Sequence, residues 1–151
     1  MNFNNVQPIP PEKRAIQGNN DQRSTINEQL LNQYWGFKTF RPLQEEIIQS
    51  VLDGNDTLAL LPTGGGKSVC YQLPALAREG LCLVISPLVA LMKDQVDDLK
   101  NKGIKALYIF SGMKPREIDI ALDNAAYGGY KFLYVSPERL ETDLFLPGRL
   151  K

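Results

Sequence analysis

A glycine-rich segment carries the residues with the clearest chemistry in this chain. It reads Pro62-Thr63-Gly64-Gly65-Gly66-Lys67-Ser68. Consecutive glycines let a backbone wrap around an anion without conflict from Cβ atoms, and the amides of such a turn point toward phosphates. Lys67 is expected to reach the β- and γ-phosphates, and the Ser68 hydroxyl is expected to bind Mg²⁺. The segment therefore predicts a site for a nucleoside triphosphate.

The flanking residues support this interpretation. An apolar run at 57–61 predicts a buried strand, and residues 69–73 predict the start of a helix. A strand, a turn and a helix in that order are the context of a phosphate-binding loop. The general pattern has glycine where this chain has Leu61, and this departure indicates a subclass of phosphate loop. The competing interpretation is an ordinary glycine-rich turn that happens to end in Lys-Ser.

Composition limits the possible classes of function. The 151 residues are enough for one domain with a core. Lysine and arginine balance aspartate and glutamate at 17 each, so nucleic-acid binding must be argued from motifs. No apolar run approaches the length that crosses a membrane, and we expect no membrane partner. Histidine is absent, which excludes histidine-based catalysis. Cys70 and Cys82 lie in apolar runs and are expected to be buried free thiols of a cytosolic protein.

The elements that must position the loop predict an α/β domain. Residues 1–23 are rich in Asn, Gln and Pro and predict a flexible leader, which leaves 24–151 for the domain. A capping box at Thr25 and Glu28 predicts a helix that ends at Gly36, and Pro42 predicts the start of a second helix. Further strands are predicted at 81–85, 106–110 and 131–135, and further helices at 88–102 and 115–126. Apolar strands alternating with helices indicate a parallel sheet with helices on both faces.

Two of the predicted strand ends carry the same dipeptide. Ser86-Pro87 follows one strand and Ser136-Pro137 follows another. Serine suits a helix N-cap and proline suits the first helical position, so each pair predicts an efficient strand-to-helix turn. Because the carboxyl ends of parallel strands form the ligand-binding edge of a sheet, the same residues also suit the phosphates of a nucleic-acid backbone.

A polar and aromatic segment precedes the loop, from Trp35 to Gln44. A glutamine amide can donate and accept at once, which matches the N6/N7 edge of adenine. An arginine guanidinium, here Arg41, can stack on a base. Considered alone, the segment would be an aromatic staple before a helix. Ahead of a phosphate loop, it resembles the adenine-recognising motif of superfamily 2 helicases.

Four segments taken in order resemble the RecQ family of DNA helicases. They are GFKTFRPLQ at 36–44, LPTGGGKSVCYQLPA at 61–75, VISPLVALMKDQV at 84–96 and YVSPERL at 134–140. The resemblance implies an incomplete RecA-like lobe of the P-loop NTPase fold, with ATP and Mg²⁺ as cofactors. It implies 3′-to-5′ unwinding of DNA coupled to ATP hydrolysis, with single-stranded or forked DNA and a second RecA-like lobe as partners. It also implies DNA repair or recombination in the cytoplasm, at the nucleoid if the source is bacterial.

The resemblance assigns roles to individual residues. The adenine base or ribose would be contacted by Phe37, Arg41 and Gln44. The triphosphate and Mg²⁺ would be held by Thr63, Gly64, Gly65, Gly66, Lys67 and Ser68. Single-stranded DNA would contact Ser86, Pro87, Leu88, Lys93, Ser136 and Arg139.

Hydrolysis requires more than a phosphate loop. An aspartate must hold Mg²⁺ and a neighbouring acid must orient the attacking water; the family supplies both from Asp-Glu-Ala-His, and this sequence contains no Asp-Glu pair. We therefore expect the amino-terminal portion of a longer helicase, which binds nucleotide weakly, does not hydrolyse it at a helicase-like rate and exposes unpaired strand edges. The alternatives are a nucleotide- or DNA-binding module without hydrolysis, and another P-loop NTPase such as a small-molecule kinase or a DEAD-box RNA helicase.

Overall fold

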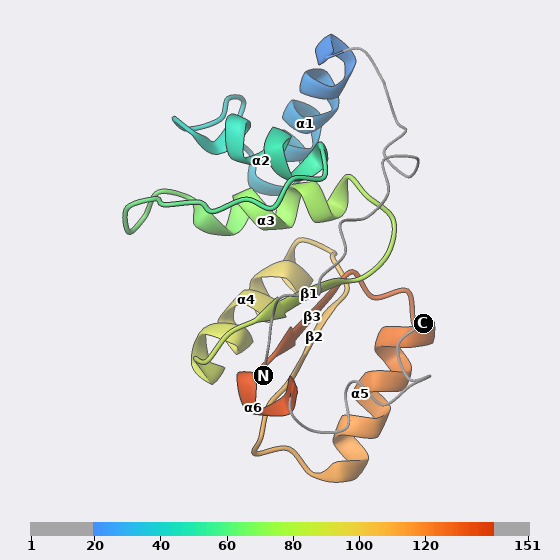
Figure 1. Ribbon diagram of the computed structural model, residues 1–151. Coiled ribbons are helices and arrows are strands. Elements are labelled where there is room, and N and C mark those ends of the chain that lie inside the picture. The colour runs from blue at the N-terminus through green and yellow to red at the C-terminus, as the bar shows by residue number, and fades with distance from the viewer. Residues whose placement is uncertain (1–19, 141–151) are drawn as a thin grey trace. The chain divides into compact units, whose positions relative to one another are not determined.

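The computed structural model describes residues 20–140, with side chains from Thr25 onward (Figure 1). The chain divides into two units, Met1–Ala77 and Arg78–Lys151. Most of the leader predicted at 1–23 lies outside the described residues, as do 141–151. Across the described range, no helix combines the length and the hydropathy needed to cross a membrane.

The first unit is helical in its described part. It contains α1 (Asn20–Trp35), α2 (Gln44–Leu52) and α3 (Lys67–Leu76), and α3 packs against both of the other helices. One apolar cluster holds the unit together, made of Leu31, Ile48, Val69 and Leu73. The helix that follows the glycine-rich loop is therefore anchored by the core of this unit.

The predicted start of the first helix is wrong, and its predicted end is confirmed. Helix α1 begins at Asn20, so Thr25 and Glu28 lie within it rather than at its N-terminus. Gly36 ends it with a φ of 74°, and the Gly36 amide donates to Asn32 O at 2.9 Å. A capping box depends on a few neighbouring residues, so it does not mark the start of a helix when the residues before it are helical too.

Helix α2 begins later than Pro42, the predicted start. Gln44 N donates to Arg41 O at 3.1 Å, which closes a turn there. Leu43 is the N-cap with a left-handed φ of 69°, and that conformation interrupts any helix before Gln44. The helix ends at Leu52 with Asp53 as its C-cap.

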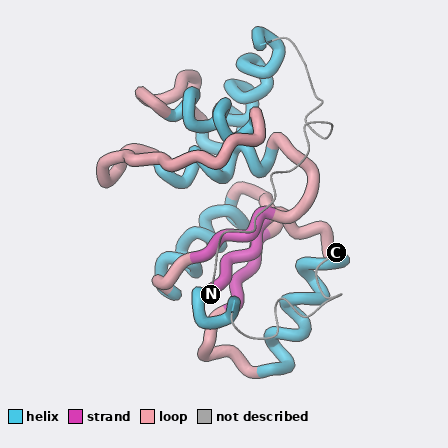
Figure 2. The backbone as a smooth tube through the Cα atoms, in the orientation of Figure 1, coloured by secondary structure: helices cyan, strands magenta, loops and turns pink. Residues whose placement is uncertain are grey.

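The buried strand predicted at 57–61 is not present. The segment is drawn as loop in Figure 2 and pairs with no described strand. Leu58 and Leu60 expose 86% and 81% of their surface. An apolar run forms a strand only where neighbouring strands complete its hydrogen bonds and cover its side chains, and no described strand lies in this unit.

The second unit contains a parallel sheet. Its strands are β1 (Cys82–Ile85), β2 (Ala106–Ile109) and β3 (Phe132–Val135), in the order β1-β3-β2. Helices α4 (Val89–Asn101) and α5 (Pro115–Tyr127) lie on opposite faces of it, and α6 (Pro137–Leu140) follows β3 (Figure 1). The predicted parallel sheet with helices on both faces is confirmed, and it is consistent with an incomplete RecA-like lobe.

Strand β3 is central and fully buried. Leu133 and Val135 pack with Ile109 and the α5 residues in one core cluster, so by alternation Phe132 and Tyr134 face the other side. Strand β1 pairs only with β3 among the described strands, and Ile85 is 53% exposed. This edge matches the expected unpaired strand with exposed apolar side chains.

The exposure of segment 57–61 makes a testable prediction about stability. Leu58→Ser and Leu60→Ser should each change the free energy of unfolding by less than about 0.5 kcal/mol, because neither side chain is buried. Leu73→Ala in the same unit should cost about 2–5 kcal/mol, because Leu73 is fully buried. Urea unfolding followed by circular dichroism measures all three. A Leu58 variant as damaging as Leu73→Ala would show that the segment is packed.

Candidate nucleotide and nucleic-acid sites

The glycine-rich loop ends where α3 begins. Gly66 is the N-cap of α3 with a φ of 79°, and Gly64 has a φ of 78°, a left-handed region that glycine adopts without steric cost. Gly65 N donates to Pro62 O at 3.0 Å, and a Cβ on Gly65 would lie 2.9 Å from that oxygen. The Val69 amide donates to Gly66 O at 3.2 Å, and the two amides before it, of Lys67 and Ser68, have no acceptor within the helix. The loop therefore has the form of an anion site at a helix N-terminus.

Two residues from the start of α2 bind the loop's carbonyl groups. Gln44 Nε2 donates to Gly66 O at 3.2 Å, and Arg41 Nη1 donates to Gly64 O. Gln44 Oε1 also accepts from the Arg41 amide at 2.9 Å. Each of these loop oxygens carries partial negative charge that would repel a nearby phosphate. Because both are engaged by donors of the protein, the loop is better suited to an anion.

The predicted adenine-binding residues lie together beside the loop. Arg41 Cζ lies 5.9 Å from the centre of the Phe37 ring, and Phe37 is 49% exposed. Gln44 is only 3% exposed, and both ends of its amide bond to the chain. Its contact with adenine stays a prediction. The bond from Gln44 to Gly66 was not foreseen, since nothing in the sequence relates positions 44 and 66.

The hydrogen bonds of Gln44 predict a stability effect. Gln44→Leu should lower the free energy of unfolding by about 1–3 kcal/mol, because Gly66 O and the Arg41 amide each lose a buried hydrogen-bond partner. Gln49→Leu is the matched control, since Gln49 Nε2 donates to the exposed Asp53 side chain and, among the described residues, to no other group. It should change stability by less than about 0.5 kcal/mol. Equal losses in the two variants, measured by thermal melting, would contradict the role given to Gln44.

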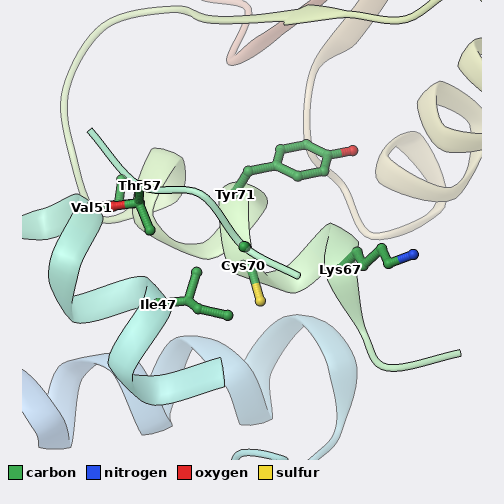
Figure 3. A pocket seen from close by; sticks show the side chains of 7 residues that line it. Ile47, Val51, Thr57, Lys67, Cys70 and Tyr71 are labelled. Atoms are coloured by element: carbon green, nitrogen blue, oxygen red, sulfur yellow. The ribbon is translucent and has the colours of Figure 1, made fainter. Parts of the chain in front are cut away.

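An apolar pocket of about 250 Å³ lies between α2, α3 and segment 57–61. Its lining comprises Ile47, Val51, Thr57, Ala59, Lys67, Cys70 and Tyr71. In Figure 3 the Lys67 side chain extends away from the apolar side chains of Ile47 and Val51. The lysine thus borders this pocket without directing its ammonium into it.

Both cysteines are free thiols, as predicted. Cys70 is buried as predicted, whereas Cys82 is partly exposed, so the predicted burial is wrong for Cys82. Burial is the main cause that raises the pKa of each thiol above its ordinary value. The protonated Cys70 Sγ donates to Gly66 O at 3.8 Å, which adds a weak donor to those from Gln44 and the Val69 amide.

A Mg²⁺ ion would have to share its ligands with bound phosphates. Within the described residues, no group of three or more His, Cys, Asp or Glu side chains could hold a metal ion. Mg²⁺ commonly binds through one or two protein oxygens together with substrate phosphates and waters. The Ser68 hydroxyl, in the first turn of α3, is suited to be such a ligand.

In the second unit, Ser86 ends β1 but does not cap α4. Ser86 N still belongs to the sheet and donates to Val135 O at 3.0 Å. The chain needs further residues to turn, so α4 starts at Val89 with Leu88 as its N-cap. The predicted Ser86 cap with Pro87 as first helical residue is therefore wrong. Ser86 Oγ accepts from the Leu88 amide at 3.4 Å, and Leu88 is 61% exposed.

The second dipeptide takes its predicted positions, because α6 begins at Pro137 directly after Ser136, but within the described residues the buried Ser136 hydroxyl makes no capping hydrogen bond. Ser136 is 2% exposed, and its amide donates to Ile109 O at 3.1 Å. Arg139 Nη2 donates to Ser111 O at 3.2 Å. Contacts of Ser136 and Arg139 with DNA stay predictions, and Ser136 is better placed to shape the turn than to contact a ligand directly.

Lys93 lies near two aromatic residues that the sequence did not single out. Its Nζ is 5.1 Å from the centre of the Phe110 ring and 6.0 Å from that of Tyr108. The available signal was the alternation of Tyr108, Ile109 and Phe110, which places both aromatic side chains on one face of β2. The second unit thus gathers Lys93, Ser86 and Arg139 around the carboxyl ends of its strands.

Comparison with known proteins agrees with these motifs. Residues 41–151 match the family described as DEAD/DEAH box helicase. ATP-dependent DNA helicase RecQ of Bacillus subtilis is 48% identical over 120 residues, which are 79% of this chain and 20% of that protein.

Two further relatives show the same pattern. Probable ATP-dependent DNA helicase RecS of B. subtilis is 47% identical over 79% of this chain and 24% of that protein. RecQ of Pasteurella multocida is 48% identical over 77% of this chain and 18% of that protein. The chain thus spans about a fifth of the length of these relatives, and the predicted resemblance to RecQ helicases is confirmed. The chain belongs to the DEAD/DEAH box helicase family.

Proposed function

We propose that this chain is the amino-terminal, ATP-binding portion of an ATP-dependent DNA helicase. The observation that carries the proposal is the loop itself, in which Arg41 and Gln44 engage the carbonyls of Gly64 and Gly66. The first two amides of α3, of Lys67 and Ser68, are then available to a triphosphate. Lys67 would contact the β- and γ-phosphates, and Ser68 would hold Mg²⁺, which neutralises phosphate charge when it is bound.

Adenine would be contacted from the same side of the loop. Phe37 and Arg41 offer an exposed ring and a guanidinium, and Gln44 offers an amide if it leaves its bonds to the chain. These contacts should favour ATP over GTP, because guanine presents a different pattern of hydrogen-bond donors and acceptors from adenine. This preference can be measured.

Unwinding belongs to a longer protein in this proposal. The sequence of 151 residues contains no Asp-Glu pair, so the chain should bind ATP without hydrolysing it at a helicase-like rate. A second RecA-like lobe would complete the motor, which moves 3′-to-5′ along single-stranded or forked DNA. DNA repair and recombination, in the cytoplasm or at a bacterial nucleoid, are the processes that such an activity serves.

Single-stranded DNA is the proposed ligand of the second unit. Ser86, Pro87 and Leu88 follow β1, and Lys93 and Arg139 lie near the carboxyl end of β2. Exposed lysines and helix N-termini commonly contact phosphates. Such contacts position a nucleic-acid strand without reading its base sequence.

Calorimetric titration with ATP and GTP, with and without Mg²⁺, tests the nucleotide site. We expect Mg²⁺-dependent binding that favours ATP. A steady-state assay with single-stranded DNA should show no stimulated turnover. Absence of ATP binding would overturn the nucleotide site, whereas robust DNA-stimulated hydrolysis that Lys67→Ala abolishes would overturn the claim that this chain alone lacks ATPase activity. Competition between single-stranded DNA and RNA separates a DNA helicase from the RNA helicase alternative.

A further inference from the structure

The carboxyl end of β2 carries a pair of aromatic side chains outside the motifs considered above. The ring centres of Tyr108 and Phe110 lie 5.9 Å apart, and both residues are partly buried. Ile109 between them faces the core cluster with α5, so the two rings lie on the opposite face. A Cβ at Gly112 would lie 2.8 Å from the Phe110 ring. The backbone of this turn therefore packs closely against Phe110 and helps to fix its ring.

The ammonium of Lys93 is held near this pair. Its distances of 5.1 Å and 6.0 Å from the two ring centres are within the range in which a cation is attracted to an aromatic face. Lys93 itself is exposed, so the rings orient the ammonium while its N–H groups stay accessible. A lysine side chain restrained in this way loses less conformational freedom when it binds an anion.

A second cation is attached to the next residue of the same turn. Arg139 Nη2 donates to Ser111 O at 3.2 Å, and Ser111 directly follows Phe110 in the chain. Lys93 comes from α4 and Arg139 from α6. Cationic side chains from two helices are thus both anchored to residues 110 and 111, at the end of one strand.

We propose that Phe110, with Tyr108, is a positioning residue that holds Lys93 ready for a phosphate of single-stranded DNA. The proposal rests on the DNA-binding function proposed above and extends that site to the end of β2. The Lys93 ammonium donates to a phosphate oxygen, a charge-assisted hydrogen bond. Phe110 contacts the lysine and not the DNA, so its removal should weaken binding without changing the charge of the protein.

The test is fluorescence anisotropy with a labelled single-stranded oligodeoxynucleotide over a range of salt concentrations. Lys93→Met should weaken binding and reduce the magnitude of the slope of log K against log salt by about 0.7, the value for one phosphate contact on a single strand. Phe110→Leu should weaken binding by about two- to fivefold and shift the slope in the same direction. Phe110→Tyr should retain the wild-type affinity, because its ring still faces Lys93.

Two further variants separate positioning from folding. In the Lys93→Met background, Phe110→Leu should cause no additional loss, because the lysine that it holds is gone. Tyr130→Leu is the matched control, since Lys105 Nζ lies 5.8 Å from the Tyr130 ring near the amino end of β2. It should leave DNA affinity unchanged.

The outcomes distinguish this proposal from the function on which it rests. If the wild-type chain binds no single-stranded DNA, both are overturned. If it binds DNA and Phe110→Leu matches wild type, or if the losses from Lys93→Met and Phe110→Leu simply add, only the positioning role is overturned. Equal losses in Phe110→Leu and Tyr130→Leu would assign the effect to general stability, and would likewise overturn it.

Discussion

Gly66→Ala should abolish measurable ATP binding and destabilise the first unit. Gly66 has a φ of 79°, and a Cβ there would lie 2.2 Å from Gln44 Nε2. An alanine in this left-handed conformation costs about 1–2 kcal/mol. The clash would also displace the buried Gln44 amide from Gly66 O and the Arg41 amide, at a cost of about 1–3 kcal/mol. We expect a total loss of about 2–5 kcal/mol and an ATP affinity reduced by more than about 100-fold.

Gly54→Ala is the matched control for this variant. Gly54 has a similar φ of 85°, and a Cβ there meets nothing within 4 Å. It should show the backbone cost alone, with ATP binding unchanged. Gly64→Ala separates the effects further, because Gly64 lies in the loop with a φ of 78° but without a clash. Urea unfolding and calorimetry measure both properties, and a Gly66→Ala chain that binds ATP like wild type would refute the geometry assigned to the loop.

Lys67→Ala should have the second largest effect, and it should be confined to ligand binding. Lys67 is exposed at the first position of α3, so its truncation removes little packing and should change stability by less than about 0.5 kcal/mol. A lost charge-assisted contact with the phosphates is worth about 1.5–3 kcal/mol, which corresponds to about a 10- to 150-fold weaker affinity for ATP.

Lys100→Ala provides the comparison for Lys67→Ala. Lys100 is an exposed lysine in the last turn of α4, so its replacement changes the net charge equally without touching the loop. Calorimetric titration with Mg²⁺-ATP should give wild-type affinity for Lys100→Ala. If the two variants bound ATP equally well, Lys67 would have no direct part in holding the triphosphate.

The contrast between Gly66 and Lys67 separates two contributions to the same site. Gly66→Ala should alter both stability and affinity, because the loop conformation and the Gln44 amide depend on each other. Lys67→Ala should alter affinity alone, because the lysine contributes charge to a loop that other contacts already hold. Measuring both properties on both variants tests this separation directly.

Elements with strong local patterns were predictable from sequence. The apolar periodicity of 88–102 and 115–126 predicted α4 and α5 closely, because each helix buries one side of its surface against the sheet. Apolar runs at 81–85, 106–110 and 131–135 predicted the three strands to within one residue at each end. The phosphate loop was equally evident, since its glycines and its Lys-Ser ending are local requirements of binding a phosphate.

Predictions from sequence were less successful for segments whose structure depends on contacts with residues far along the chain. The run at 57–61 has the composition of a buried strand, yet it has no described strand beside it and Leu58 and Leu60 are exposed. The cap predicted at Ser86 failed because its amide is held by Val135, a residue far along the chain. The composition of a segment indicates which secondary structure it can form. Its contacts with other segments determine whether that structure forms.

The sequence by itself determined the family of this protein and the residues suited to bind a triphosphate. Only the tertiary structure decided how those residues are arranged. It joined Gln44 to Gly66 and Arg41 to Gly64, and it placed Lys93 near Phe110. The physical reason is that a phosphate loop is a contiguous pattern set by local backbone geometry, whereas these contacts join side chains to residues far along the chain, which folding alone brings within reach.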